Sequence, residues 1–350
     1  MTDKSLPQIN YTIKELSNDK NYWFFRTNAG LYYADFALNN YIGLGWDEIS
    51  DLSMFNVSTE EEEKELKETV KTLVSQKYPD DSRAGLTAGQ IIKFVNEMKI
   101  GDIVIIPDAG SHSISIGIVE SDVYLQEIAE ADSLDESDDE NLGYEQCPYL
   151  KRRNIKWVTS ASKYQIDPYL FKLFCAIHTI SDANSYAKYI DRIMYPIYMK
   201  NDEIHITLNV EQDESITARS MNKLLSGILS ILDNYTNTEV SKEADKLALK
   251  VIVESPGKLE FIGGTLVGCA ICSSLALFLF GADIKFSCGD IQFSAKSQGA
   301  SSAITEYRKE EHRHEEVMAT VEKSKEIEEL KKALADMKVQ LPGPIKNSTL

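Results

Sequence analysis

The sequence predicts an α+β protein, in which strand-forming and helix-forming segments are largely separate along the chain. In the first half, runs of aromatic and β-branched residues are bounded by glycine, proline and asparagine, which is typical of strands and turns. Segments with charged residues around an apolar stripe predict helices. With 350 residues, of which 43% are hydrophobic, the chain is long enough for two or three domains that each have a core.

The composition narrows the class of protein. The chain carries 37 basic and 55 acidic residues, a formal net charge of -18, which excludes a protein that coats nucleic acid through a generally positive surface. A local basic groove remains compatible with this total. The five cysteines are too dispersed for a disulfide framework, and the polar stretch 1–21 lacks the apolar core of a secretory signal. We therefore expect a cytoplasmic protein.

Residues 1–165 are predicted to form one mixed unit. Tyr22–Arg26 and Leu31–Phe36 are expected to be strands joined by a turn at 28–30. Tyr41–Trp46 is expected to be a third strand, whose glycines indicate a close approach of another part of the chain.

Two helices are predicted next. Ser58 or Thr59 caps the first, which has four acidic residues in its first turn, and the second begins at Thr87, where Gln90 would complete a capping box. An acidic stretch, 127–145, is expected to be a solvated loop. Further strands are predicted at 103–106, 114–119 and 151–158.

After residue 165 the order of elements is helix, helix, then strand-helix-strand-strand. Asp167–Pro168 is a helix start, with a capping residue followed by proline. The second group is expected to form a small β-α-β-β sandwich. The predicted organisation is a sensor domain at 1–165, a helical linker at 166–200, a small α/β module at 201–260, an apolar segment at 261–282, and a hairpin with a charged C-terminal helix at 283–350.

The apolar segment 261–282 carries no charge over about 22 residues, and ~20 residues are enough to cross a bilayer as a helix. A transmembrane helix is the favoured interpretation. The alternative is a buried core element, since the segment lacks aromatic belts and flanking lysine clusters. After it, 283–295 is predicted to be a hairpin, and about 303–340 a charged helix that forms a short coiled coil or packs on the body.

Motifs for catalysis are absent from the sequence. It contains no phosphate-binding loop, no metalloprotease motif and no nucleophile elbow. The Cys269–Cys272 pair lacks a second ligand pair, and the five histidines are scattered. Fragments of a nuclease motif near Asp283 are incomplete. We therefore predict a protein that is not an enzyme and has no metal or cofactor.

One group of residues does suggest binding. Aromatic residues crowd the first strands, and a basic run closes the unit. Nucleic acid is held by cations that contact phosphates and by flat side chains that stack on bases, and a flipped base needs an aromatic wall. The alternative to a binding site is that the aromatic residues form the core of a β-sheet and the basic residues are ordinary surface cations. The candidate nucleic-acid-binding residues are Trp23, Arg26, Trp46, Ser113, Lys151, Arg152, Arg153, Lys156 and Trp157.

The order of these motifs resembles a known family. An aromatic-Trp-x-x-Arg start, the Tyr-Ile-Gly-Leu-Gly-Trp strand at 41–46, Gly101–Asp102 before a strand, and Arg-Asn-Ile-Lys-Trp at 153–157 resemble the PUA/EVE-like β-barrel modules of Mrr-type and McrB-type bacterial restriction proteins. The similarity covers about 20–160. It implies a barrel that recognises nucleic acid or modified bases.

The leading hypothesis is therefore a non-enzymatic bacterial anti-phage defence protein. Its cytoplasmic barrel would bind nucleic acid or a modified nucleotide, the apolar segment would couple this event to the inner membrane, and the C-terminal helix would form a homo-oligomer. One alternative is a soluble scaffold subunit that works with other defence proteins and buries the apolar segment. A second is a nuclease with a dispersed site.

Overall fold

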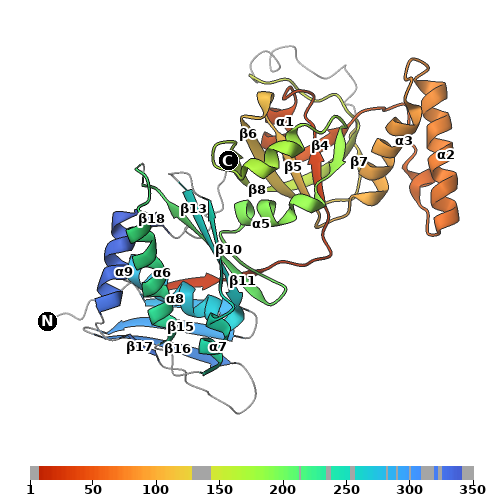
Figure 1. Ribbon diagram of the computed structural model, residues 1–350. Helices are drawn as coiled ribbons and strands as arrows, with labels where there is room; N and C mark the ends of the chain where they lie inside the picture. Colours follow the sequence, from red (N-terminus) through yellow and green to blue (C-terminus); the bar gives the residue numbers. More distant parts are fainter. Residues whose placement is uncertain are drawn as a thin grey trace. The chain divides into compact units, whose positions relative to one another are not determined.

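The protein is an α+β protein whose strands form a curled half-barrel sheet and further mixed sheets (Figure 1). The computed structural model divides the chain into two compact units. The first is Asp19–Met194, and the second combines Met1–Asn18 with Tyr195–Ser348. The described residues are 8–127, 143–212, 214–233, 238–252, 257–280, 283–288, 291–298, 301–308, 319–321 and 325–340. Most of the predicted acidic loop, at 128–142, lies outside them.

The first unit is built on the half-barrel sheet. Its path is β4-β8-β6-β5-β3-β9, and β7 pairs with β8. The 12-residue strand β8 pairs with β4 and β7 through its first residues and with β6 through its remainder. A bulge beside Gly117 increases the local twist, so the sheet curls around β8. The strands are β3 (Tyr22–Phe25), β4 (Tyr41–Leu44), β5 (Ile103–Pro107), β6 (Ser113–Val119), β7 (Tyr124–Leu125), β8 (Lys151–Ser162) and β9 (Ile180–Asp182).

Helices cover this sheet and close its core. The predicted helix after Thr59 is confirmed with its capping box, in which Thr59 and Glu62 satisfy each other's backbone N–H groups. Its apolar stripe is buried at Leu66, Val70 and Val74. The helices are α1 (Tyr33–Leu38), η1 (Leu52–Phe55), α2 (Glu60–Lys77), α3 (Ala84–Ile92), η2 (Lys93–Glu97), η3 (Ala109–Ser111), η6 (Pro168–Leu170), α4 (Phe171–Phe174), η7 (Asn184–Tyr186) and α5 (Ala187–Met194).

Three local predictions for this unit are wrong. Leu31–Phe36 is not a strand, because Asn28, Ala29 and Gly30 all adopt positive φ and lead into helix α1. Gln90 does not cap α3; its side-chain oxygen instead accepts the N–H of Ile180 at 2.6 Å and so fixes the start of β9. The sequence also predicts two consecutive long helices after residue 165. Instead, β9 separates short helices there.

The second unit joins the two ends of the chain. Strand β2 pairs with β10 in a six-stranded sheet of path β12-β13-β11-β10-β2, with β18 beside β11, and β1 pairs with β14 in a five-stranded sheet of path β1-β14-β15-β16-β17. The three predicted strands of the β-α-β-β module all lie in the first of these sheets, but two helices, and not one, lie between β11 and β12. The strands are β1 (Gln8–Thr12), β2 (Lys14–Glu15), β10 (Ile197–Lys200), β11 (Glu203–Val210), β12 (Ala248–Ile252), β13 (Gly257–Gly264), β14 (Asp283–Cys288), β15 (Ile291–Gln298), β16 (Ser301–Arg308), β17 (Ala319–Val321) and β18 (Val339–Gln340).

The apolar segment 261–282 is not one long helix. Its first residues complete β13, and helix α8 (Thr265–Phe280) has 16 residues. Within the described part of the chain, no helix has the length and apolar character needed to span a bilayer. Helix α8 contacts β11 and β13 of one sheet, β14 and β15 of the other, and the helices α6 (Ala218–Asp233) and α7 (Thr238–Ala244). The favoured transmembrane interpretation is therefore wrong, and the buried alternative is the one that the structure shows.

The C-terminal segment is also more varied than one charged helix. It contributes strands β16 and β17 before the helix α9 (Lys325–Asp336). The apolar residues Leu330, Leu334 and Met337 are buried in the core of the second unit, and α9 packs on α6. The sequence analysis leaves two possibilities for this helix, a short coiled coil or packing on the rest of the protein. The structure shows the second.

The packing of α8 generates a first prediction. Gly268→Ala should lower the free energy of unfolding by about 1–3 kcal/mol, because the added Cβ would collide with Cβ of Ile204 on β11. Gly89→Ala in α3 is the matched control, since its Cβ would meet no atom within 4 Å. Urea unfolding followed by circular dichroism measures both. A Gly268→Ala chain as stable as the wild type would contradict the packing of α8 against β11.

Candidate functional site

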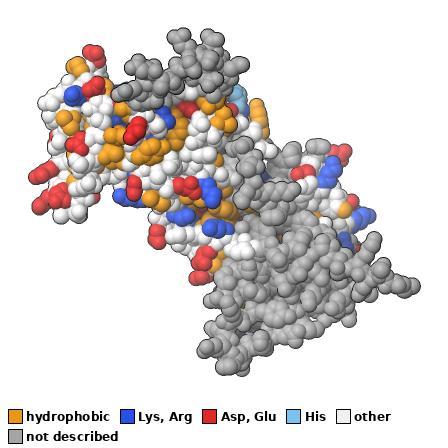
Figure 2. All heavy atoms as spheres, turned by 180° about the vertical axis from the view of Figure 1, so that it is seen from behind, with side chains coloured by type: hydrophobic (Ala, Val, Ile, Leu, Met, Phe, Trp, Pro, Cys, Tyr) orange, Lys and Arg blue, Asp and Glu red, His pale blue; other side chains and the backbone are white. Residues whose placement is uncertain are grey.

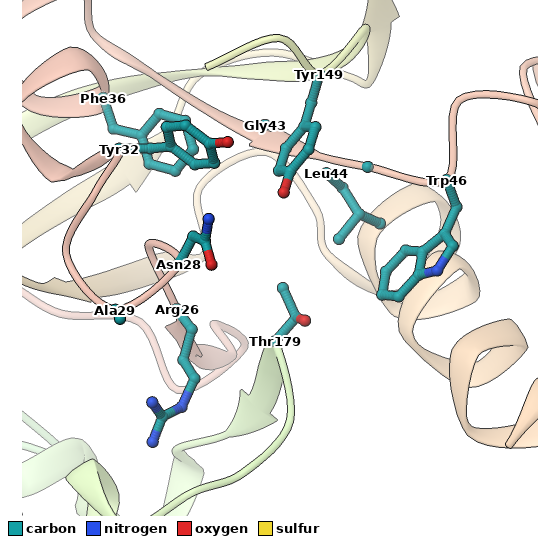
Figure 3. Close-up of a pocket in the computed structure, with 11 residues that line it drawn as sticks. Arg26, Asn28, Ala29, Tyr32, Phe36, Gly43, Leu44, Trp46, Tyr149 and Thr179 are labelled. Carbon is teal, nitrogen blue, oxygen red and sulfur yellow. The ribbon is translucent and has the colours of Figure 1, made fainter. Parts of the chain in front are cut away.

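A pocket of about 500 Å³ opens in the first unit where several loops meet the half-barrel (Figure 3). It lies at the end of β3, at the end of β4, beside the segment that leads into β8, and before β9. Its lining residues therefore come from distant parts of the chain and share no local motif. They are Arg26, Asn28, Ala29, Tyr32, Phe36, Gly43, Leu44, Gly45, Trp46, Tyr149 and Thr179.

Four aromatic rings contribute to the pocket wall. In Figure 3, Tyr32 and Phe36 lie on one side, Trp46 lies on the other beside Leu44, and Tyr149 lies between them. The ring centroids of Tyr32 and Tyr149 are 5.4 Å apart at 77°, and those of Tyr32 and Phe36 are 6.2 Å apart. The first pair is an edge contact and the second is tilted at 45°, so Tyr32, Phe36 and Tyr149 restrain one another's orientation.

Polar groups face the rings across the open space. Asn28, Thr179 and Arg26 lie on this side, and the Arg26 side chain extends away from the aromatic wall (Figure 3). Arg26 donates through Nε to the carbonyl of Ala176 at 2.6 Å and through Nη2 to that of Phe174 at 3.0 Å. Its backbone N–H donates to the carbonyl of Thr179. Arg26 therefore fixes the loop before β9 at the rim of the pocket.

Unusual backbone conformations surround this pocket. Asn28, Ala29 and Trp46 have φ values of 53°, 56° and 59°. Such values cost an alanine or a tryptophan roughly 1–2 kcal/mol, because Cβ crowds the following carbonyl. Strain of this kind persists where surrounding contacts impose it and often marks a functional site.

The position of Tyr149 depends on one glycine and a buried carboxylate. A Cβ on Gly45 would lie 3.1 Å from the Tyr149 ring, so a larger residue would force that ring to shift. Asp35 is 3% exposed and accepts hydrogen bonds from the hydroxyl of Tyr41, from the amide of Asn39 and from the N–H of Cys147 at 2.8 Å. These bonds fix the segment that carries Tyr149. The close approach predicted for the glycines of 41–46 is thus observed.

The position of Trp46 depends on a buried lysine. Lys151 is fully buried, and its Nζ lies 2.9 Å from the Trp46 carbonyl and 3.3 Å from Oδ1 of Asp47. The same Asp47 oxygen accepts the N–H of Leu150. Burial lowers the pKa of Lys151, while the Asp47 carboxylate opposes that change. The lysine therefore holds the strained corner that presents Trp46.

Burial also changes the acidity of two groups beside the pocket. It raises the pKa of Tyr149 to about 12, and nearby acidic groups and the hydrogen bond with Tyr32 add to this effect. The Tyr149 hydroxyl therefore stays protonated from pH 6 to pH 9, roughly, and remains a hydrogen-bond donor. Burial raises the pKa of the Cys147 thiol to about 11.

The structure brings only part of the predicted site together. Arg26 and Trp46 line the pocket. Trp157 is half-buried, and its Nε1 donates to the carbonyl of Phe36 at 3.0 Å, which supports the aromatic wall from behind. Trp23 is buried in the core, where its Nε1 donates to Asp102 at 2.8 Å. Its ring is therefore covered by the fold.

The basic residues of β8 are used mainly inside the fold. The buried Arg153 donates to the carbonyls of Phe94, Val95 and Ser121, and burial lowers its pKa to about 10. Arg152 donates to the carbonyls of Tyr149 and Cys147.

Two predicted residues lie away from the pocket lining. Lys156 is exposed on β8, and Ser113 starts β6 with its N–H bonded to Asp108. Reasoning from the sequence missed Asn28, Tyr32, Phe36, Tyr149 and Thr179. The signals that pointed toward them were the turn at 28–30, the glycines near Trp46 and the crowding of aromatic residues in the first predicted strands, which includes Tyr32.

Among the residues that the structure describes, no group of three or more His, Cys, Asp or Glu side chains is arranged to hold a metal ion.

The buried lysine generates a second prediction. Lys151→Met should lower the free energy of unfolding by about 1–3 kcal/mol, because the Trp46 carbonyl would lose its donor. Lys156→Met, on the same strand with an exposed side chain, should change stability by no more than ~0.5 kcal/mol. Urea denaturation of both variants gives the comparison. Equal stabilities would show that Lys151 does not hold this corner.

The raised thiol pKa generates a third prediction. Iodoacetamide at about pH 8 should alkylate the exposed Cys175 and leave Cys147 unmodified, because only the thiolate reacts. Peptide mass mapping of the native chain separates the two sites. Alkylation of both cysteines to the same extent would contradict the burial of Cys147 beneath the pocket.

Residues 26–182 match the model of a family described as a domain of unknown function, DUF8426. The matched stretch contains every residue that lines the pocket. No curated protein and no solved structure matches the chain. The first unit of the chain is therefore similar to DUF8426, a similarity that covers less than half of the full sequence.

Proposed function

We propose that the first unit binds a nucleobase, such as a modified base of nucleic acid, in the pocket lined by Trp46 and Tyr149. The observation that supports this most is the combination of four aromatic rings with polar groups across a pocket of about 500 Å³. Pockets for small molecules typically enclose ~300–1,000 Å³. A flat heterocycle has two π faces for the rings and a polar edge for the opposite side.

The polar side suits a base better than a purely apolar ligand. The Asn28 amide offers both donors and an acceptor, and the Thr179 hydroxyl can donate or accept. Such groups recognise the hydrogen-bonding edge of a base that has left its stack. The Tyr149 hydroxyl, already hydrogen-bonded with Tyr32, stays protonated near neutral pH and adds an uncharged polar group beside the rings. The site thus offers both stacking and edge recognition.

The curled sheet agrees with the resemblance to PUA/EVE-like modules. The pocket is the place where such a module would bind its ligand. Under this proposal the chain is a bacterial defence protein that senses foreign or modified nucleic acid inside the cell, and the second unit passes this event to partner proteins or to further copies of the chain. The cationic run of β8 then stabilises the pocket, and the pocket itself carries the recognition.

Binding of nucleotides tests the proposal and gives a fourth prediction. Isothermal titration of the full chain with the unmodified and the methylated or hydroxymethylated deoxynucleoside monophosphates should reveal binding of at least one of them. Trp46→Ala should weaken it by about 5- to 150-fold, because a base–aromatic stack contributes ~1–3 kcal/mol.

The control is Tyr164→Ala, since Tyr164 is 85% exposed and does not line the pocket. This variant should bind the nucleotide as the wild type does. If no nucleotide binds, or if Trp46→Ala binds as tightly as Tyr164→Ala, the pocket does not recognise a base.

A further inference from the structure

A cluster of exposed aromatic and basic side chains lies on the segment that leads to the pocket. We call it the aromatic–lysine platform. The inference drawn from it below rests on the proposed function. Tyr169 and Phe171 are 43% and 42% exposed, although large aromatic side chains are usually covered. The platform consists of Tyr169, Phe171, Lys172, Lys188 and Tyr189.

Four members of the platform, Tyr169, Tyr189, Lys172 and Lys188, are joined by ring and cation–π contacts. The rings of Tyr169 and Tyr189 stack with centroids 5.1 Å apart. Nζ of Lys172 lies 4.5 Å from the centroid of Tyr169, and Nζ of Lys188 lies 4.9 Å from that of Tyr189. Both lysines are exposed, and neither has a carboxylate partner among the described residues. The platform therefore presents two positive charges next to two stacked rings.

Arg26 connects this platform to the pocket. Helix α4 begins with Phe171 and Lys172 of the platform and ends at Phe174, whose carbonyl accepts a hydrogen bond from Arg26. Arg26 also bonds the carbonyls of Ala176 and Thr179, and both Arg26 and Thr179 line the pocket. The chain thus passes from the platform to the pocket rim within a few residues.

The charge of this region differs from that of the whole molecule. Between residues 163 and 192, four lysines and arginines stand against three aspartates, in a chain of net charge -18. One of these aspartates, Asp167, is paired with Arg192 at 2.9 Å. Figure 2 shows hydrophobic patches between charged side chains on the described part of one face of the molecule. An acidic protein that keeps a locally basic and aromatic surface favours a polyanion with flat groups as its ligand.

We infer that the platform binds the nucleotides that flank the base held in the pocket, and that the ligand is a single-stranded nucleic acid. Single strands are held by cations along the backbone and by aromatic side chains on which successive bases stack. In a duplex the base faces are already stacked on each other, so they are not available to the rings of Tyr169 and Phe171.

Binding of oligonucleotides tests this inference and gives a fifth prediction. Fluorescence anisotropy with the full chain should show that a single strand of about 12 nucleotides, carrying the base selected by titration, binds more tightly than the matching mononucleotide. The double variant Lys172→Gln/Lys188→Gln should lower the slope of log Kobs against log salt by about 1.4, since each phosphate contact on a single strand contributes ~0.7. Tyr169→Ala should weaken binding at least fivefold, and Tyr169→Phe should restore it, because the ring and not the hydroxyl is needed.

Lys67→Gln is the matched control, since Lys67 is exposed on α2. The platform variants should bind the mononucleotide as the wild type does, which also shows that the pocket is folded. An oligonucleotide that binds no more tightly than the mononucleotide, a preference for duplex, or platform variants equal to Lys67→Gln would each overturn the inference while the base pocket stands. Loss of all mononucleotide and oligonucleotide binding would reject the proposed function as well. Binding to phosphatidylserine vesicles that depends on the two lysines, without oligonucleotide binding, would assign the platform to a lipid surface.

Discussion

The contact between the Lys151 ammonium and the Trp46 carbonyl is the interaction on which the candidate site most depends. Lys151 begins β8, the strand around which the half-barrel curls, and Trp46 follows β4, which pairs with it. A buried ammonium needs its hydrogen bonds, and the Trp46 carbonyl and Asp47 supply them. The Lys151 ammonium therefore connects strand β8 of the sheet with the Trp46 corner of the pocket.

The next two residues of β8 show why the basic run was hard to interpret from sequence. Arg152 donates to carbonyls of the preceding segment, at Cys147 and Tyr149, and Arg153 donates to carbonyls far away in the sequence, at Phe94 and Val95. Any residue can supply a carbonyl, so these acceptors leave no pattern in the sequence. A run of cations that faces phosphates and a run that closes the fold look alike before the tertiary contacts are known.

The same limit explains the apolar helix α8. A helix with apolar residues all round is expected both in a bilayer and between two protein layers. The length of the helix distinguishes a transmembrane helix from a buried one. That length depends on where β13 ends, at Gly264. Local signals worked better where they were self-contained, as in the capping box of α2 and the β-branched strand β5. Of the pocket lining, only Arg26 and Trp46 were predicted, because they closely follow the recognisable strands β3 and β4, whereas Tyr149 and Thr179 come from loops.

The strained backbone gives the pocket a physical consequence for recognition. Ala29 and Trp46 stay in left-handed conformations because buried hydrogen bonds and close-packed neighbours hold the surrounding chain. The cost of ordering these residues is met during folding, so a ligand need not supply it on binding. Under the proposed function, the four rings around the pocket favour a flat aromatic ligand. On the same proposal, discrimination between related bases would rest on Asn28 and Thr179, since a base that left their polar groups unpaired would be penalised.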